Sequence, residues 1–379
     1  MMPGGPQGVQ HELSPDLDRA GPADDPSDFG RRLWQLTPRT PVTPVLVAAN
    51  IGLFAAMVWR GVHPWSPNTD SLIAWGANYG PRTAAGEWWR LVSSAFLHVG
   101  VAHLLLNLWV LRQVGGLVER LLGNWGFLAA YLFSAVAGSL ASVAWRPGGV
   151  SAGASGAIFG LFGALIAFLV HHRRVVPRAV LDRLRTSAVA FVGCNVAFGL
   201  LVPNIDQAAH LGGLAGGFLF GLVLAHPPSA AGAASRPRRL GLAVILGAAV
   251  FPTLAWALPR PVDWMGELDQ LTAMEERALG AYRRATDQAQ GGQISDQTLA
   301  QVIEREILPQ WRTARQHLGS LSGERGVPTQ SVRRLERYMA AREEAFELLA
   351  EAARTGNQSM AKSALAKHTE ATRLGQASD

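Results

Sequence analysis

Seven apolar segments alternate with polar links between residues 42 and 258. Each is close to the roughly 20 apolar residues that a helix needs to cross the hydrocarbon core of a bilayer. Several contain Gly or Pro, which membrane bundles tolerate because neighbouring helices satisfy the freed backbone groups. We therefore expect an all-helical membrane protein of six or seven spans. The segments are Val42–Trp59, Leu91–Val114, Trp125–Ala144, Gly153–Val170, Ser187–Val202, His210–Ala225 and Leu240–Leu258.

The regions on either side of the apolar segments differ from them in composition. Residues 1–40 are rich in Pro, Gly and Asp and lack the apolar stretch of a signal peptide, so they predict a disordered tail. Residues 261–379 are charged, and apolar residues recur there at helical spacing, as in Val332, Leu335 and Met339. This pattern predicts a separate helical domain, for which the sequence names no binding partner.

The formal net charge of +6 comes largely from arginines at the ends of the apolar segments, so we expect no nucleic-acid partner. Arginines gather between the fourth and fifth segments and in a basic loop at 227–239. Positively charged loops stay in the cytoplasm. This rule predicts a cytoplasmic N-terminus, a seventh span at 240–260 and an extracytoplasmic domain at 261–379. A bacterial plasma membrane is the expected setting.

Three apolar segments carry polar side chains at informative positions, and ionisable groups inside a bilayer are costly and point to function. The second segment supplies His98, His103 and Asn107, the last two on one helical face. The fourth supplies Ser155 and the sixth supplies His210. Under the predicted topology these segments all run in the same direction. The polar groups are therefore expected at similar depth, in the outer half of the bilayer.

Strips of glycine follow two of these polar residues. At 100° per residue, His210 and the glycines after it lie within about 80° of one another, and a similar strip follows Ser155. Glycines at this spacing let two membrane helices approach closely. We therefore expect His210 to be pressed against the neighbourhood of Ser155. The strips are Gly213, Gly217 and Gly221 in the sixth segment, and Gly156, Gly160 and Gly163 in the fourth.

A serine beside a histidine is a nucleophile–base pair, because imidazole accepts the hydroxyl proton near neutral pH. Acyl transfer also needs fixed donors for an oxyanion, and His103, Asn107 and the Ser155 backbone N–H are candidates. No acidic residue lies in the spans near His210, so a dyad rather than a triad is predicted, with no metal or cofactor. Taken singly, each residue is more often structural. A transporter would instead place polar groups near the midplane and in both leaflets.

The ordered set of residues closely resembles the rhomboid family of intramembrane serine proteases, over roughly residues 89–225. Residues 153–156, GASG, resemble the family's G-x-S-G motif, and 103–107, HLLLN, resemble its H-x-x-x-N motif. Residues 209–217 are similar to its A-H-x-x-G-x-x-x-G motif. Further matches are His98 with an upstream histidine, Trp89 and Arg90 with the W-R pair of the first loop, and Glu119 and Arg120 with an acidic–basic pair.

This resemblance implies a six-span catalytic core at 41–226, followed by the seventh helix and the helical tail. It implies a Ser155 nucleophile, a His210 base, and His103 and Asn107 as oxyanion donors. Single-span membrane proteins are the implied substrates. Phe159 departs from the tyrosine of some members, and a non-catalytic rhomboid-like client-binding protein is the alternative. The implied supporting residues are His98, Gly153, Gly156, Phe159, Gly213, Gly217, Trp89, Arg90 and Glu119.

Overall fold

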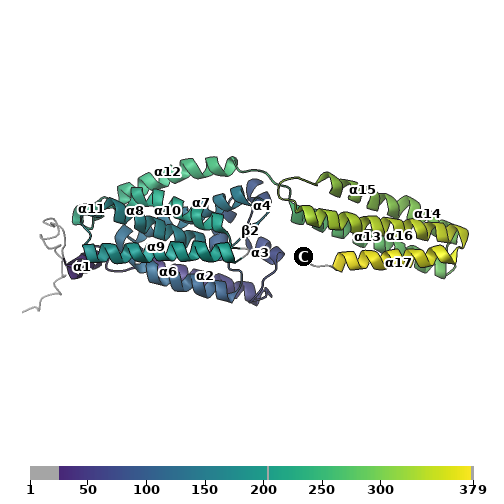
Figure 1. Ribbon diagram of the computed structural model, residues 1–379, viewed down its shortest axis with the longest axis horizontal. Helices are drawn as coiled ribbons and strands as arrows, with labels where there is room; N and C mark the ends of the chain where they lie inside the picture. The colour runs from purple at the N-terminus through teal and green to yellow at the C-terminus, as the bar shows by residue number, and fades with distance from the viewer. Residues whose placement is uncertain (1–24, 203–204, 377–379) are drawn as a thin grey trace, which may run out of the picture. The chain divides into compact units, whose positions relative to one another are not determined.

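The computed structural model describes residues 25–202 and 205–376. The chain divides into two compact units, the first ending at Pro259 and the second beginning at Arg260. Figure 1 shows that both are built almost entirely from helices. Within the described residues the strands β1 (Asn78–Tyr79) and β2 (Val150–Ser151) form a two-stranded antiparallel pair.

Six helices of the first unit are long and apolar enough to cross a membrane, and α8 is a shorter apolar helix. Together they match the seven apolar segments of the sequence, so the predicted all-helical membrane fold is confirmed. The chain is a multi-pass membrane protein. The helices are α2 (Val42–Trp59), α6 (Val101–Leu122), α7 (Asn124–Trp145), α8 (Ser155–His171), α9 (Arg178–Leu201), α10 (Gln207–Leu224) and α12 (Arg236–Trp256).

Several helix boundaries differ from those expected from apolarity. Helix α6 begins ten residues later than the apolar segment, because Gly100 has a φ of 99° and closes the preceding turn. Before it, α5 (Arg90–Ser93) and η2 (Ser94–Phe96) form separate short turns. The predicted basic loop at 227–239 instead contains α11 (Ala230–Ala234) and the start of α12. Apolarity marks the lipid-embedded part of a helix, whereas the hydrogen-bonded helix extends into the polar flanks.

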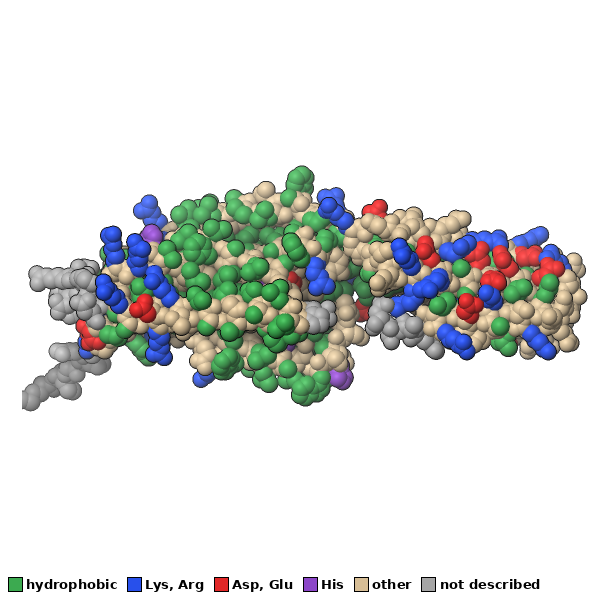
Figure 2. Space-filling view, in the orientation of Figure 1, with side chains coloured by type: hydrophobic (Ala, Val, Ile, Leu, Met, Phe, Trp, Pro, Cys, Tyr) green, Lys and Arg blue, Asp and Glu red, His purple; other side chains and the backbone are tan. Residues whose placement is uncertain are grey.

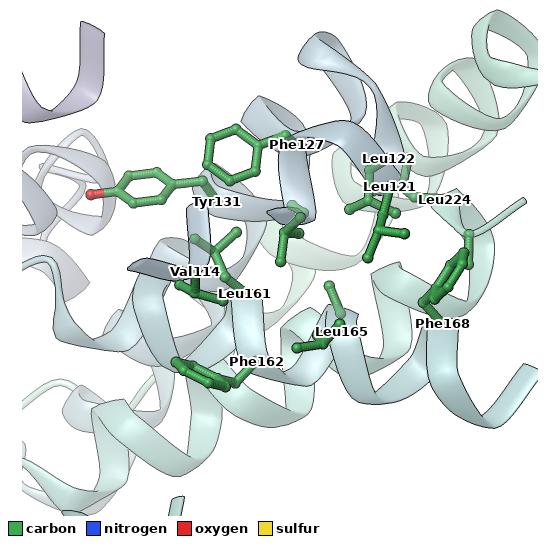
Figure 3. Close-up of a cluster of buried hydrophobic side chains, with 14 of the residues drawn as sticks. Val114, Leu121, Leu122, Phe127, Tyr131, Leu161, Phe162, Leu165, Phe168 and Leu224 are labelled. Carbon is green, nitrogen blue, oxygen red and sulfur yellow. The ribbon is translucent and has the colours of Figure 1, made fainter. Parts of the chain in front are cut away.

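Helices α6, α7, α8 and α10 enclose the main apolar core of the first unit (Figure 3). Thirteen of the 17 residues of α8 are buried, so this helix is central. Helix α9 is the opposite case, with only Leu181 and Ala188 buried among its 24 residues. Its remaining apolar surface suits contact with lipid, and Figure 2 shows apolar side chains over the middle of this unit. Core residues labelled in Figure 3 include Val114, Leu121, Phe127, Tyr131, Leu161, Phe162, Leu165 and Phe168.

The segment before α2 is partly helical, which corrects the prediction of disorder over residues 1–40. Helix α1 (Pro26–Leu36) is capped by Asp25, whose carboxylate accepts the Ser27 N–H. Phe29 and Leu33 are buried on its inner side, while its remaining face is largely polar. The composition of the segment did not indicate this helix, because only two apolar residues, Phe29 and Leu33, are buried by it. Residues 1–24 of the predicted tail lie outside the described residues.

The link between α2 and α6 contains short elements that brace the segment before α8. They are α3 (Thr69–Trp75), β1 and α4 (Gly80–Ala84). Strand β1 pairs with β2 through Asn78 opposite Ser151 and Tyr79 opposite Val150. Because β2 ends four residues before Ser155, this pairing fixes the chain as it enters α8.

The second unit is a set of amphipathic helices with its own apolar core, centred on Trp311 and Phe346. The stripe of Val332, Met339 and Phe346 is buried, as its helical spacing predicts. The helices are α13 (Trp264–Gln290), α14 (Asp296–Val302), the π-helical turn η3 (Ile303–Ile307), α15 (Leu308–Ser320), α16 (Thr329–Thr355) and α17 (Gln358–Gln376).

Candidate active site

Ser155 is the first residue of α8, at the point where the chain turns from β2 into the helix. Gly153 makes this turn with a φ of 140°, a conformation that side-chain-bearing residues rarely adopt. The Ser155 Oγ lies 2.9 Å from the His210 Nε2, within hydrogen-bond distance. The structure therefore brings together two residues that are 55 positions apart in the sequence.

Close contact between α8 and α10 makes this distance possible. A Cβ atom built on Gly213 would lie 2.0 Å from the Gly156 carbonyl oxygen, and one built on Gly217 would lie 2.0 Å from the Gly160 carbonyl oxygen. The two backbones are thus nearer than any side chain allows. The predicted glycine strips do face each other. They hold His210 of α10 against the end of α8 that carries Ser155.

His210 is held on two sides. Its ring is only 8% exposed and stacks on Phe159, with ring centroids 4.3 Å apart and an interplanar angle of 9°. Its Nε2 faces Ser155, whereas its Nδ1 is buried with no hydrogen-bond partner among the described residues. Among the described residues, no carboxylate is hydrogen-bonded to the ring. The Phe159 ring makes the stacking contact that a tyrosine ring could make here, but it has no hydroxyl group.

One acidic residue near the dyad was not identified from the sequence. Asp206 caps α10 by accepting the Ala209 N–H at 2.9 Å, and its other oxygen accepts the Ser142 hydroxyl of α7 at 2.5 Å. It is the only carboxylate among the described residues that line the dyad's cavity. Asp206 lies just before the apolar segment, so a search inside that segment passes over it. An acidic residue directly before a predicted helix was the available signal.

His103 and Asn107 lie on the face of α6 that borders the same cavity. The Asn107 Nδ2 donates to the His103 carbonyl at 2.8 Å, which fixes the amide against its own helix. The His103 ring is packed where a side chain at Gly153 would be, since a Cβ there would lie 2.6 Å from its Cε1. His98 is fully buried, and its ring centroid lies 5.3 Å from that of His103. His98 therefore supports His103 rather than lining the cavity.

The cavity has a volume of about 330 Å³. Its lining includes Ser155 and His210 among several polar residues, and most of its other lining residues are apolar. Among the described residues, no group of three or more His, Cys, Asp or Glu side chains is arranged to hold a metal ion. The apolar walls include Val99, Leu106, Val110, Phe191, Phe198 and Ile205.

Trp89 and Arg90 lie away from this cavity. The Arg90 guanidinium is buried, donates to the carbonyls of Ile73 and Ala77 at 2.6 and 3.1 Å, and pairs with Glu87 at 2.7 Å. It also lies 4.6 Å from the centre of the Trp89 ring, a cation–π distance. These contacts tie the link between α2 and α6 into one piece, so the two residues are structural.

Glu119 is also remote from the cavity, near the other end of α6. Its carboxylate is fully buried and accepts the backbone N–H groups of Val42 and Thr43, each at 2.9 Å, together with the Thr43 hydroxyl at 2.7 Å. A helix leaves its first N–H groups without internal partners. Glu119 therefore caps the beginning of α2 from a neighbouring helix.

Comparison with known proteins identifies the class to which this arrangement belongs. Residues 85–227 match the model of the Rhomboid domain. The chain is 37% identical over 249 residues to Rhomboid protease GluP of Bacillus subtilis, covering 66% of this chain and 46% of that protein. It is 35% identical over 208 residues to Rhomboid-like protease 1 of Toxoplasma gondii, covering 50% of this chain and 67% of that protein. The chain therefore belongs to the rhomboid family.

The coverage differs among relatives. RHOMBOID-like protein 4 of Arabidopsis thaliana is 38% identical over 138 residues, which is 36% of this chain and 34% of that protein. The chain thus spans less than half of the length of GluP and about a third of the length of this plant relative. The shared region contains the dyad and the helices that hold it. At the level of the family, these similarities support an intramembrane protease.

Proposed function

We propose that this protein is an intramembrane serine endopeptidase in which Ser155 is the nucleophile and His210 the general base. The observation that carries the proposal is the 2.9 Å contact between the Ser155 Oγ and the His210 Nε2 in the lining of a largely apolar cavity. A serine hydroxyl is a weak nucleophile until a neighbouring base accepts its proton. This contact supplies that base.

In the first half-reaction, the Ser155 Oγ attacks the scissile carbonyl carbon while its proton moves to the His210 Nε2. Nε2 must therefore be the unprotonated nitrogen before attack, with the proton on the buried Nδ1. The resulting imidazolium donates the Nε2 proton to the leaving amine, which departs and leaves an ester on Ser155. Water then attacks the ester with the same base, releasing the acid and restoring the hydroxyl.

The negative charge that develops on the carbonyl oxygen needs donors already in place. We assign this role to the His103 ring, the Asn107 amide and the Ser155 N–H. The Ser155 N–H belongs to the first turn of α8, where backbone N–H groups have no partner within the helix. Loss of one such donor costs about 3 to 4 kcal/mol of the barrier. Asp206 adds a negative charge on the side of the cavity where the imidazolium forms.

The substrates we propose are single-span membrane proteins. A transmembrane helix keeps its carbonyls in hydrogen bonds, so the segment attacked must first unwind into the cavity beside Ser155. The apolar walls suit the side chains of such a segment, while the polar centre suits its exposed carbonyl. The catalytic core in this proposal is 41–226, and it acts without a cofactor.

The proposed orientation places the N-terminus in the cytoplasm of a bacterial cell and the dyad in the outer half of the plasma membrane. It rests on the arginines in the links after α8 and between α10 and α12, at the helix ends remote from Ser155. Residues 261–379 then lie outside the cytoplasm. The motifs give this helical unit no task.

The test is cleavage of a reporter transmembrane segment by the purified full-length protein in liposomes. Ser155→Ala and His210→Gln are expected to abolish cleavage, while Ser187→Ala, an exposed serine on α9, keeps it. Persistent proteolysis by folded Ser155→Ala would refute the assignment. The alternative is a non-catalytic client-binding protein, and it predicts that wild type and Ser155→Ala both retain the reporter without cutting it.

A further inference from the structure

A second cavity lies in the first unit, at the end of α6 opposite to His103. Its volume is about 430 Å³, and it is bounded by the link from α1 to α2, the turn from α6 to α7, and the start of α12. Among the described residues that line it there are two arginines, Arg39 and Arg236, and no carboxylate. A cavity with two guanidinium side chains and no acid selects an anion.

Arg236 reaches across this cavity and contacts only uncharged acceptors. Its Nε donates to the His226 Nε2 at 2.9 Å, one Nη donates to the Leu36 carbonyl at 3.0 Å, and the other donates to the Thr37 hydroxyl at 2.9 Å. A guanidinium has five N–H donors, so two remain for a ligand. Its positive charge is not neutralised by any carboxylate among the described residues. Arg39 is exposed and likewise forms no such pair.

The remaining lining is typical of a membrane interface. Trp125 is 71% exposed at the rim, and tryptophan rings favour the level of lipid headgroups. Leu122 and Leu240 form an apolar side, and from Leu240 the apolar surface of α12 continues toward the bilayer centre. A ligand seated here would thus meet positive charge at one end and hydrocarbon-like surface at the other. Free phosphate uses only the first of these features.

The surroundings add to the positive potential at this end of the unit. Figure 2 shows basic side chains, all of them arginines in this unit, gathered at the end of the unit where α1 and α11 lie. Arg173 and Arg174 follow α8 there, and Arg238 and Arg239 follow Arg236 in α12. Basic side chains near a bilayer surface attract anionic lipids.

We propose that this cavity binds the phosphate of a glycerophospholipid with a net negative charge. The Arg39 and Arg236 guanidinium groups would hold the phosphate oxygens, the Trp125 ring would lie at the level of the glycerol, and an acyl chain would follow α12. Bound lipid would then join three segments, the α1–α2 link, the α6–α7 turn and α12. The site is separate from the dyad and does not depend on the proposed proteolysis.

The experiment is native mass spectrometry of the full-length protein in detergent, after delipidation, titrated with phosphatidylglycerol, phosphatidylcholine or inorganic phosphate. Arg39→Gln is the main variant, because Arg39 is exposed and its side chain is not needed for packing. Arg174→Gln is the matched control, since it removes one exposed arginine at the same end but outside the cavity. Arg236→Lys keeps the charge where Arg236→Gln would risk loosening α1.

We expect wild type to retain phosphatidylglycerol over phosphatidylcholine. Arg39→Gln should weaken retention about fivefold, because it removes one of the two guanidinium groups proposed to hold the phosphate, while Arg174→Gln, outside the cavity, should weaken it clearly less. Trp125→Ala should weaken lipid retention and leave phosphate binding unchanged. Equal retention by Arg39→Gln and wild type, or equal retention of the two lipids, would overturn the proposal. Binding of inorganic phosphate with no lipid would also overturn it, and would assign the site to a free anion.

Discussion

Phe159 and His210 form a parallel stack that joins α8 to α10. Phe159 lies on α8 one turn after Ser155, and His210 projects from α10, with ring centroids 4.3 Å apart. The phenyl ring thus sets the plane of the imidazole while its Nε2 faces the Ser155 oxygen. Ser155 and Phe159 are carried by the same helix, so their relative position is independent of how α10 moves.

Replacing Phe159 tests this orienting role. Phe159→Tyr keeps the ring and is expected to keep activity, whereas Phe159→Leu should lower kcat up to about tenfold, since an aromatic pair contributes about 0.5–1.5 kcal/mol. Reporter cleavage by purified protein gives kcat and KM for each variant. Equal kcat for Leu and Phe at this position would show that the ring does not orient the base.

The contact between α8 and α10 predicts a difference between two identical substitutions. In Gly217→Ala the new methyl group would meet the Gly160 carbonyl oxygen at 2.0 Å, so the helices must separate and both activity and thermal stability should fall. Overpacking of this kind costs about 1–3 kcal/mol. Gly116→Ala on α6 meets nothing within 4 Å and should be neutral or slightly stabilising. If the two variants unfold at the same temperature, the glycine contact does not limit helix approach.

Asp206 predicts separable effects of charge and of hydrogen bonding. Asp206→Asn can still cap α10, because asparagine is also a favourable N-cap, but it removes the negative charge beside the dyad. We expect kcat to fall about tenfold, or about 1.4 kcal/mol, with KM unchanged. Ser142→Ala removes the link to α7 but keeps the charge, so its kcat should fall less. The comparison requires matched thermal stability of both variants. A greater loss of kcat in Ser142→Ala would mean that the link matters more than the charge.

His226 predicts a dependence of stability on pH at the opposite end of the bundle. It lies between α10 and α11. Burial lowers its pKa to about 4, and the positive charges of Arg236 and Arg239 also lower it, whereas the hydrogen bond to the Pro227 carbonyl raises it. An unfolded histidine titrates near pH 6.5. The contribution of neutral His226 is therefore complete above about pH 6.5 and is lost as the pH falls toward 4. Below that range, the protonated Nε2 can no longer accept the Arg236 N–H.

The measurement is the unfolding temperature of the full-length protein between about pH 7.5 and about pH 3.5, which brackets the titration range of His226. His226→Gln keeps a neutral acceptor and should show a smaller fall in unfolding temperature on acidification than wild type. His63→Gln, a histidine in the link between α2 and α3, serves as the control. Parallel pH curves for wild type and His226→Gln would exclude His226 as a source of the acid sensitivity.

The sequence predicted the features that depend on spacing within one helix. The glycine strips of α8 and α10 and the polar face of His103 and Asn107 could be placed because helical geometry repeats regularly. It did not predict where α6 begins, since the turn before α6 depends on the positive φ of Gly100, where a Cβ would lie 2.5 Å from the carbonyl oxygen of the remote residue Trp65. Asp206 escaped notice for a related reason, because its partner Ser142 comes from a different helix.

The residues matched only through family motifs show the same limit. Arg90 and Glu119 could be located in the sequence, but Arg90 donates to the Ile73 carbonyl and Glu119 accepts the Val42 N–H, both in other segments. A carboxylate that caps a neighbouring helix has no local signature. Helix α1 was missed because two apolar anchors in a polar segment give too weak a pattern, and only tertiary packing decides that they are buried.

Among residues 153–156, only Ser155 has a side-chain oxygen. Gly153 is required by its left-handed backbone and by the His103 ring that occupies the place of its side chain. A Cβ atom built on Gly156 would lie 3.2 Å from the Ala209 carbonyl oxygen. A search for a different reactive side chain in this scaffold would therefore gain little from varying Gly153 and Gly156. These glycines are needed for the backbone conformation and the close helix contact, so only the position of Ser155 can carry a new functional group.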